Sequence, residues 1–306
     1  MQTAAPAAAV CTGKKFGLRR GTMDPLTSLI TGWKIPVGPW GKAVIDFIVT
    51  YFQWLFDAIK TVLNWSVENT SYLLLQLPPA LLAVLLAAFA YWLQRSKALA
   101  FGVLLGFLFI INQGLWKETV QTLVLVVAAT AVSMAIGVPL GIWAAHSPRV
   151  WRVTQPILDL MQTMPTFVYL IPILILFGLG AAPALIVTII FAMPAPVRMT
   201  YLGLTSIPKP MLEAGESFGA TKRQLLWKVE LPAALPSIMA GLTQCIMLSL
   251  SMVVFATLIG APSLGNPVNK ALANRNIPLG IEAGLALVVL AIILDRALAV
   301  RSGVKK

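Results

Sequence analysis

The sequence predicts an all-α membrane protein, a polytopic bundle of about seven transmembrane helices. Of its 306 residues, 58% are hydrophobic and only 11% are charged, and the mean hydropathy is +0.84. A soluble core of this size could not bury so much apolar surface, whereas membrane-spanning helices leave it facing lipid. The apolar residues also fall into runs of about 20 residues, the length that crosses a bilayer as a helix, and the loops between them are short and basic.

The N-terminal part of the chain differs from the rest. Residues 1–42 are rich in Ala, Gly, Pro, Lys and Arg and lack the apolar core of a signal peptide, so they predict a disordered N-terminal tail. Residues 43–66 carry apolar side chains at helical spacing, interrupted by Asp46 and Asp57. Two carboxylates in mid-bilayer would each be costly, so this segment is predicted to be an amphipathic helix on the membrane surface.

Residues 75–300 form the predicted transmembrane domain. Its seven apolar segments are residues 75–93, 98–114, 119–145, 157–179, 182–199, 236–260 and 279–299. On one side of these spans, the loops and the C-terminal tail hold thirteen Lys or Arg residues, and the opposite loops hold three: Lys117, Lys270 and Arg275. Cytoplasmic loops are the basic ones, so the N-terminus is expected outside and the C-terminus in the cytoplasm.

A polar stretch at residues 204–232 interrupts the apolar pattern between the fifth and sixth spans. Gly219 is the residue best able to take the left-handed conformation that ends a helix, and Thr221 with Gln224 makes a T-x-x-Q capping box that starts another. Leu231-Pro232 is expected to stop that second helix. The pattern therefore predicts an amphipathic helix-turn-helix on the cytoplasmic side.

The spacing in this stretch resembles the cytoplasmic EAA loop of ABC importer permeases, which docks on the ATP-hydrolysing subunit. The residues that carry the resemblance, and to which it gives an ATPase-coupling role, are Glu213, Ala214, Gly215, Gly219, Ala220, Leu231 and Pro232. Gly215 departs from the pattern, because the family usually has a second Ala there. This glycine is expected to loosen the first helix by roughly 1 kcal/mol without removing the docking surface.

A second motif points to one group of these permeases. Residues 158–172 read LDLMQTMPTFVYLIP and closely resemble permeases of the glycine betaine/proline type, and the resemblance extends discontinuously over roughly residues 115–300. The resemblance implies a multi-pass permease subunit in a bacterial inner membrane that carries quaternary ammonium compatible solutes. Choline or trimethylamine N-oxide are alternative solutes. An ion-gradient-driven secondary carrier is the alternative of another class, but the inverted repeats and coupling carboxylates of such carriers are not found.

Residues 158–172 also predict a helix that is broken twice, at Pro165 and at Pro172. Pro165 and Pro172 each remove an intrahelical hydrogen bond, so the carbonyls of Met161 and Val168 need other partners. The candidate pathway residues offer neutral polar groups or soft apolar contacts suited to a methylated ammonium: Gln162, Thr163, Met164, Pro165, Phe167, Tyr169, Ser249 and Met252. Packing between helices is the alternative role for all eight, and the favoured one for Ser249 and Met252.

Charged residues near the span ends are given structural roles. Asp295 and Arg296 are expected to form a local charged pair at the cytoplasmic end of the last span, and Asp159 to remain solvated near the headgroups. His146, the only histidine, is placed in a cytoplasmic loop and cannot by itself make a metal site.

The sequence lacks nucleotide-binding and catalytic motifs, and this absence indicates which partners the chain needs. The sequence has no G-x-x-x-x-G-K-S/T, G-x-S-x-G or H-E-x-x-H motif, so the chain is predicted not to be an enzyme and to hold no cofactor, with ATP and Mg bound by a partner ATPase. The resemblance implies two ATPase copies, a second permease copy related by a two-fold axis, and a periplasmic or lipid-anchored substrate-binding protein. The net charge of +12 is interpreted as a membrane-topology signal among lipids and not as nucleic-acid binding.

Overall fold

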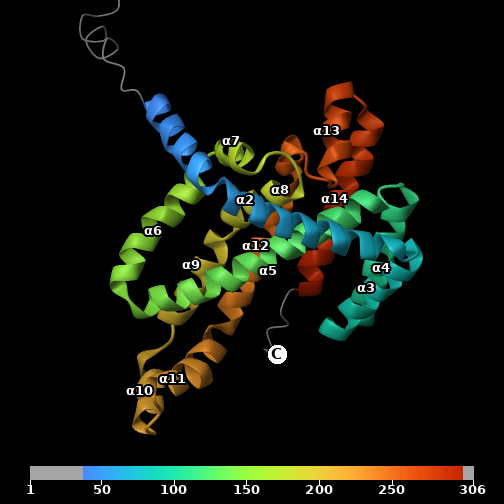
Figure 1. The fold of residues 1–306 in the computed structure, drawn as a ribbon. Helices are drawn as coiled ribbons and strands as arrows, with labels where there is room; N and C mark the ends of the chain where they lie inside the picture. Colours follow the sequence, from blue (N-terminus) through green and yellow to red (C-terminus); the bar gives the residue numbers. More distant parts are fainter. Residues whose placement is uncertain (1–36, 299–306) are drawn as a thin grey trace, which may run out of the picture. The chain divides into compact units, whose positions relative to one another are not determined.

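The computed structural model describes residues 37–298, and every regular element in this range is a helix (Figure 1). The helices are α2 (Val37–Gln76), α3 (Pro79–Gln94), α4 (Lys97–Asn112), α5 (Trp116–His146), α6 (Pro148–Thr163), α7 (Thr166–Phe177), α8 (Ala181–Ala192), α9 (Pro194–Thr205), α10 (Lys209–Ser217), α11 (Lys222–Leu225), the π-helix η1 (Leu226–Glu230), α12 (Leu231–Ala256), the 3-10 helix η2 (Thr257–Ile259), α13 (Gly265–Asn274) and α14 (Ile277–Leu298). The predicted helical membrane fold is confirmed.

The chain divides into two compact units, residues 1–48 and 49–306. The described part of the first unit, residues 37–48, is the N-terminal part of α2, so the helix begins before the predicted position 43. Residues 1–36 of the predicted tail lie outside the described residues. All contacts reported below are within the second unit.

Helix length and composition support four to six spans in the described part of the chain. Four segments are long and apolar enough to cross a membrane: Trp116–His146, Ala181–Thr205, Lys222–Ile259 and Ile277–Leu298. Two bent pairs, α2 with α3 and α6 with α7, would each add one span, and α4 is a shorter apolar helix. The number seven therefore stays a prediction.

The chain turns sharply where α2 meets α3. The bend is 107°, and Pro78 lies directly before α3, where proline keeps the preceding residue out of the helical conformation. Further back on α2, the Asn64 side chain accepts a hydrogen bond from the Ala182 N–H at 2.8 Å, and Phe56 packs edge-on against Phe177. These contacts hold α2 against the junction of α7 and α8.

Small residues bring α5, α9 and α12 together in the core. A Cβ atom on Gly141 would lie 2.7 Å from Cβ of Thr200 and 2.8 Å from the carbonyl oxygen of Val197, and one on Gly203 would lie 2.8 Å from Cβ of Ser237. Glycine therefore allows the backbones of α5 and α9, and of α9 and α12, to approach closely. Such packing is the main source of helix association in a membrane, where lipid is as apolar as the side chains.

Gly141→Ala tests this close packing. The new methyl group would collide with backbone, so we expect the variant to lose about 1–3 kcal/mol of stability despite the higher helix propensity of alanine. Thermal unfolding of the purified chain in detergent measures the loss. Gly284→Ala on α14 is the control, because nothing lies within 4 Å of its Cβ position. Equal melting temperatures for the two variants would contradict the interpretation.

Candidate functional site

The predicted fourth span is broken into two helices. α6 and α7 meet at an angle of 98°, and Met164 and Pro165 between them have extended backbone with ψ of 132° and 137°. Proline disfavours the helical conformation of the residue before it, so Met164 leaves the helix. Pro172 lies inside α7 without breaking it. The span is thus interrupted once, at Pro165, and the expectation of a second break is wrong.

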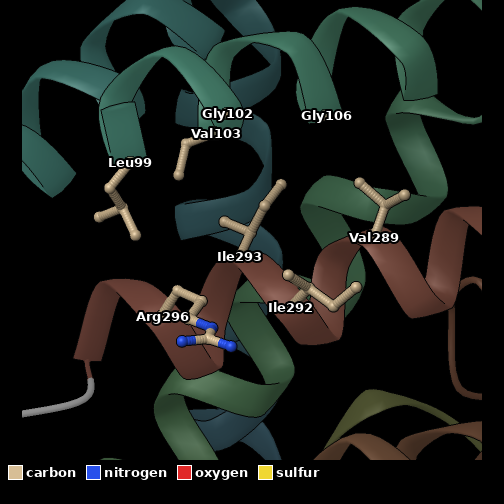
Figure 2. Close-up of a pocket in the computed structure, with 8 residues that line it drawn as sticks. All are labelled: Leu99, Gly102, Val103, Gly106, Val289, Ile292, Ile293 and Arg296. Atoms are coloured by element: carbon tan, nitrogen blue, oxygen red, sulfur yellow. The ribbon is translucent and has the colours of Figure 1, made fainter. Parts of the chain in front are cut away.

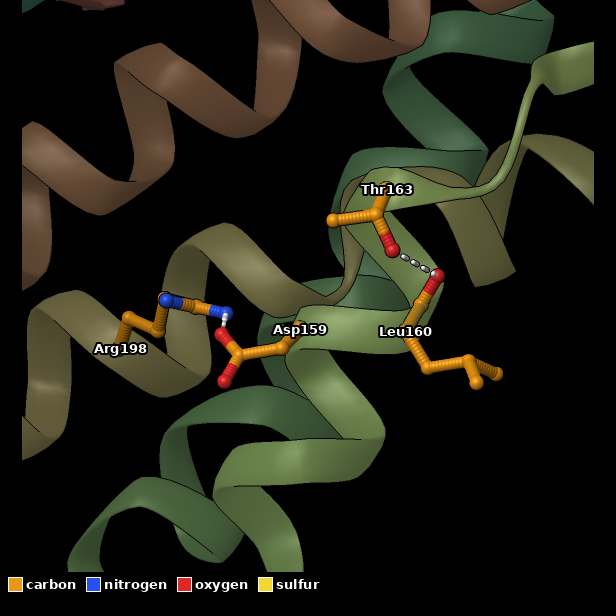
Figure 3. Close-up of polar contacts among 4 residues, drawn as sticks. All are labelled: Asp159, Leu160, Thr163 and Arg198. Carbon is orange, nitrogen blue, oxygen red and sulfur yellow. Dashed lines mark hydrogen bonds and ion pairs between the residues drawn. The ribbon is translucent and has the colours of Figure 1, made fainter.

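The break is closed by hydrogen bonds from its own side chains. The Tyr169 hydroxyl donates to the carbonyl of Met161, which is the acceptor that Pro165 leaves free. The Thr163 hydroxyl and the Met164 N–H donate to the carbonyl of Leu160 at 3.3 and 3.1 Å (Figure 3). Because these partners are internal, the bend needs no solute or water at Met161.

An ion pair fixes α6 against α9 next to the break. Arg198 Nη2 lies 2.5 Å from Asp159 Oδ1, and the two side chains face each other between the helices in Figure 3. Trp151 stacks on Tyr201 a few turns away, with ring centroids 3.6 Å apart. Arg198 lies inside α9, and Asp159 is paired with it while its side chain stays half exposed, in agreement with the expectation that this carboxylate is solvated. α6 is therefore clamped at two points.

The structure separates the predicted pathway residues into two groups. Gln162, Thr163, Pro165 and Phe167 are exposed around the break, and Met164 and Tyr169 are half-buried there. Ser249 and Met252 are fully buried in α12, where the Thr130 hydroxyl donates to Ser249 Oγ at 3.5 Å. Packing accounts for these two, and a pathway role for any of the eight stays a prediction.

The exposed side of α12 includes Ser251, a secondary pathway candidate from the sequence, and three residues that the sequence did not single out. The four recur at helical spacing on one side of the helix: Gln244, Met247, Ser251 and Phe255. Phe255 packs edge-on against Phe167 of α7, with centroids 5.5 Å apart. We call these five residues the α7–α12 face. Gln244 is a polar residue within an apolar run, and exposing its amide to lipid would be unfavourable. This residue could therefore have indicated, from the sequence, which side of the helix faces away from lipid.

The helix-turn-helix has the predicted capping. Gly219 is left-handed, with φ of +76°, and the N–H groups of Gly219 and Ala220 bond to the carbonyls of Glu216 and Gly215, which is a complete Schellman motif. Thr221 and Gln224 form the predicted reciprocal capping box. In Figure 1, α10 and α11 extend from the end of the second unit opposite to α7 and α13.

Gly215 has a packing role that the sequence did not reveal. A Cβ atom there would lie 2.6 Å from Cδ1 of Leu225, so the glycine allows α10 and α11 to lie close together. The expected loosening of the first helix is therefore offset by closer packing. Of the other residues in this element, Glu213 and Ala214 are exposed on α10 and Ala220 is half-buried.

The prediction that Leu231-Pro232 stops the second helix is wrong. The chain passes from α11 through the π-helix η1 into α12 without interruption, and residues Lys222–Ile259 form one segment. In η1 the Leu231 N–H bonds to the carbonyl of Leu226, one residue further back than in an α-helix. This wider turn accommodates Pro232, which lacks an N–H and would otherwise crowd the preceding turn.

A side-chain contact between Glu230 and His146 joins this π-helix to α5. Glu230 is 9% exposed, and its Oε2 lies 2.9 Å from Nε2 of His146. The other ring nitrogen of His146 lies 2.9 Å from the carbonyl of Ile142. His146 is the last residue of α5, so the prediction that it lies in a loop is wrong. The His146 ring gives the buried Glu230 carboxylate a partner. A buried carboxylate without a partner would destabilise the fold considerably.

The tip of the helix-turn-helix exposes a large apolar side chain. Phe218, directly before Gly219, is 92% exposed, and Met211 and Trp227 of the same element are also exposed. Single exposed apolar residues are common, but three on one small projecting element are typical of a docking surface. The sequence analysis did not select them.

Comparison with known proteins decides the family. Residues 137–300 match the family described as "Binding-protein-dependent transport system inner membrane component". The chain belongs to this family. It is 43% identical to the glycine betaine transport system permease protein OpuAB of Bacillus subtilis, with 86% of this chain and 93% of that protein covered. It is 42% identical to the glycine betaine/proline betaine transport system permease protein ProW of Escherichia coli, with 86% and 74% covered.

A solved structure shares the fold of this family member. The MetNI methionine ABC transporter in an inward-facing conformation matches with a TM-score of 0.54 at 22% identity, over 61% of this chain and 93% of that one. As a permease subunit of this family, the chain is an inner membrane protein and not an enzyme. A binding-protein-dependent importer also requires an ATPase and a substrate-binding protein as partners.

Tyr169→Phe tests whether the tyrosine closes the break. The variant leaves the Met161 carbonyl without its partner, so we expect a loss of about 1–3 kcal/mol in the free energy of unfolding. Thermal unfolding of the purified chain measures it. Tyr201→Phe is the matched control, because in the described part of the chain its hydroxyl has no hydrogen-bond partner and its ring keeps the stack on Trp151. Equal losses for both variants would refute the role of the hydroxyl.

Proposed function

We propose that this permease carries glycine betaine, proline betaine or a close quaternary ammonium solute inward. The observation that carries the proposal is the 42–43% identity, over 86% of the chain, to permeases whose names state these solutes. A trimethylamine N-oxide permease of Pelagibacter ubique is 36% identical, but this chain covers only 41% of it. A choline permease of Bacillus subtilis matches over 49% of this chain. These alternatives are therefore less supported.

The chemistry around the break agrees with such a solute. The nearest carboxylate, Asp159, is paired with Arg198 and so presents little net charge. The exposed groups there are aromatic, amide, hydroxyl and thioether side chains. They can contact the methyl groups and diffuse positive charge of a quaternary ammonium without holding it tightly.

A second copy of the chain would complete the pathway. The α7–α12 face mixes neutral polar and apolar side chains and is exposed in a single chain. A two-fold axis beside this face would place two such faces opposite each other, with the breaks at Pro165 close to the space between them. Two ATPase copies would then bind, one to each permease.

Coupling to the ATPase would use the projecting helix-turn-helix. A partner that binds around Phe218 pushes on α10 and α11, and the continuous segment Lys222–Ile259 carries the motion to α12. The Glu230–His146 pair carries it to α5. The element thus acts as a rigid lever and not as a hinged loop.

The basic loops favour an orientation with the N-terminus outside. To test it, Cys11 and Cys245 are replaced by alanine, and cysteine is introduced at Ser206 or Ala273, both exposed. A membrane-impermeant thiol reagent should label the residue 206 cysteine only from the cytoplasm and the residue 273 cysteine only from outside. Labelling of both from one side would overturn the orientation.

The function is tested by uptake into vesicles that contain the chain, its ATPase and its binding protein. We expect ATP-dependent uptake of labelled glycine betaine that exceeds uptake of choline and trimethylamine N-oxide. Phe167→Ala should lower the maximal rate and leave the external affinity unchanged, because selection belongs to the binding protein. Uptake of choline alone would refute the solute, and a wild-type rate for Phe167→Ala would refute the pathway.

Gly219→Val tests the lever in the same vesicles. A β-branched residue is strongly disfavoured at φ of +76°, so α10 and α11 should no longer meet at the right angle. We expect ATP hydrolysis to continue while uptake falls at least tenfold. Gly219→Asn is the control, since asparagine tolerates the left-handed conformation and should retain most uptake. Normal uptake by the valine variant would exclude the proposed coupling.

A further inference from the structure

A narrow apolar cavity lies between α4 and α14. Its volume is about 320 Å³. Figure 2 shows the residues that line it, four from each helix: Leu99, Gly102, Val103, Gly106, Val289, Ile292, Ile293 and Arg296. Seven of the eight are apolar or glycine. We call this cavity the α4–α14 slot.

Two glycines shape the slot in different ways. A Cβ atom on Gly106 would lie 2.9 Å from both Ile293 Cδ1 and Val289 Cγ1, so the two helices touch there and close one end. Gly102, one turn earlier, has no atom within 4 Å of its Cβ position. The space beside Gly102 is therefore not filled by any side chain of residues 37–298.

Among the described residues, Arg296 is the only charged one that lines the slot, and it lies at the end near Leu99 (Figure 2). The expected pair with Asp295 is not formed: among residues 37–298, Arg296 has no ion-pair or hydrogen-bond partner, and it is exposed. Neighbouring side chains on a helix point about 100° apart, which explains why the two do not meet.

Further positive charge lies at the same end of the slot. α3 ends at Gln94, whose side chain donates to the Ala297 carbonyl at 3.1 Å, so the α3–α4 turn lies beside the end of α14. Arg95 lies in that turn, and Lys97 is the first residue of α4. A guanidinium binds phosphate oxygens with matching geometry, and basic pockets between transmembrane helices bind lipid headgroups.

We propose that the α4–α14 slot binds one anionic phospholipid. One acyl chain lies beside Gly102 between the helices, and the headgroup phosphate contacts Arg296. A transmembrane helix of a partner does not fit, because the slot is narrow and closed by the helix contact at Gly106. A larger cavity of about 720 Å³ shares Val103 and Ile293 with the slot but has no charged lining residue, so lipid there would not be selected by its headgroup.

The test uses the full-length chain, purified in detergent, with lipid binding counted by native mass spectrometry. The probes are phosphatidylglycerol and phosphatidylcholine with the same acyl chains. We expect one tightly retained phosphatidylglycerol per chain. Arg296→Gln should weaken phosphatidylglycerol binding about fivefold, on the scale of one basic residue near an anionic headgroup. It should weaken phosphatidylcholine binding less, because the choline cation offsets the phosphate charge of that lipid.

Gly102→Leu should reduce retained phosphatidylglycerol to the phosphatidylcholine level, because the side chain enters the open space without a backbone clash. Two control variants should bind lipid like the wild type. Gly284→Leu places leucine at another open position of α14, and Lys270→Gln removes an exposed charge on α13.

Three results would overturn the proposal. The first is equal binding of the two lipids by the wild type. The second is phosphatidylglycerol binding that survives both Arg296→Gln and Gly102→Leu. The third is a disulfide between two Gly102→Cys chains in membranes, which would show that a second copy covers the slot. The readout is lipid retention and not uptake. Its failure would therefore leave the proposed solute and coupling untouched.

Discussion

Inside a membrane every backbone carbonyl needs a hydrogen-bond partner within the protein, and two prolines of this chain meet that constraint in opposite ways. Pro165 breaks its helix, and the carbonyl it frees is taken by the Tyr169 hydroxyl. Pro232 does not break its helix, because the π-turn before it shifts the hydrogen bonding by one residue. The chain therefore bends at Pro165, where polar side chains are exposed. At Pro232 the helical segment Lys222–Ile259 continues without a break.

Both solutions depend on close contacts around them. The bend is held by Asp159–Arg198 and by the stack of Trp151 on Tyr201, so α6 cannot swing away from α9. α9 is in turn packed through glycines against α5 and α12, the two helices that connect to the helix-turn-helix. The helix-turn-helix is thus joined by direct contacts to the helices that surround the break.

Features set by local chemistry could be predicted from the sequence. The left-handed Gly219, the capping box at Thr221 and the break at Pro165 each depend on a few neighbouring residues. The side-chain contacts to Arg198 and His146 join residues far apart in sequence, and no local pattern indicates them. The stop expected at Pro232 is not observed because a π-turn accommodates this proline, and no short sequence motif distinguishes that turn from an α-helical one.

The π-turn also sets the rotational phase between the coupling element and α12. A π-helical turn contains one residue more than an α-helical turn, and one residue corresponds to a rotation of about 100° around the helix axis. Without that extra residue in Leu226–Glu230, Phe218 and its neighbours would point toward a different side of the bundle while the α7–α12 face stayed where it is. One additional residue thus sets the direction in which the exposed tip of the helix-turn-helix points relative to α12.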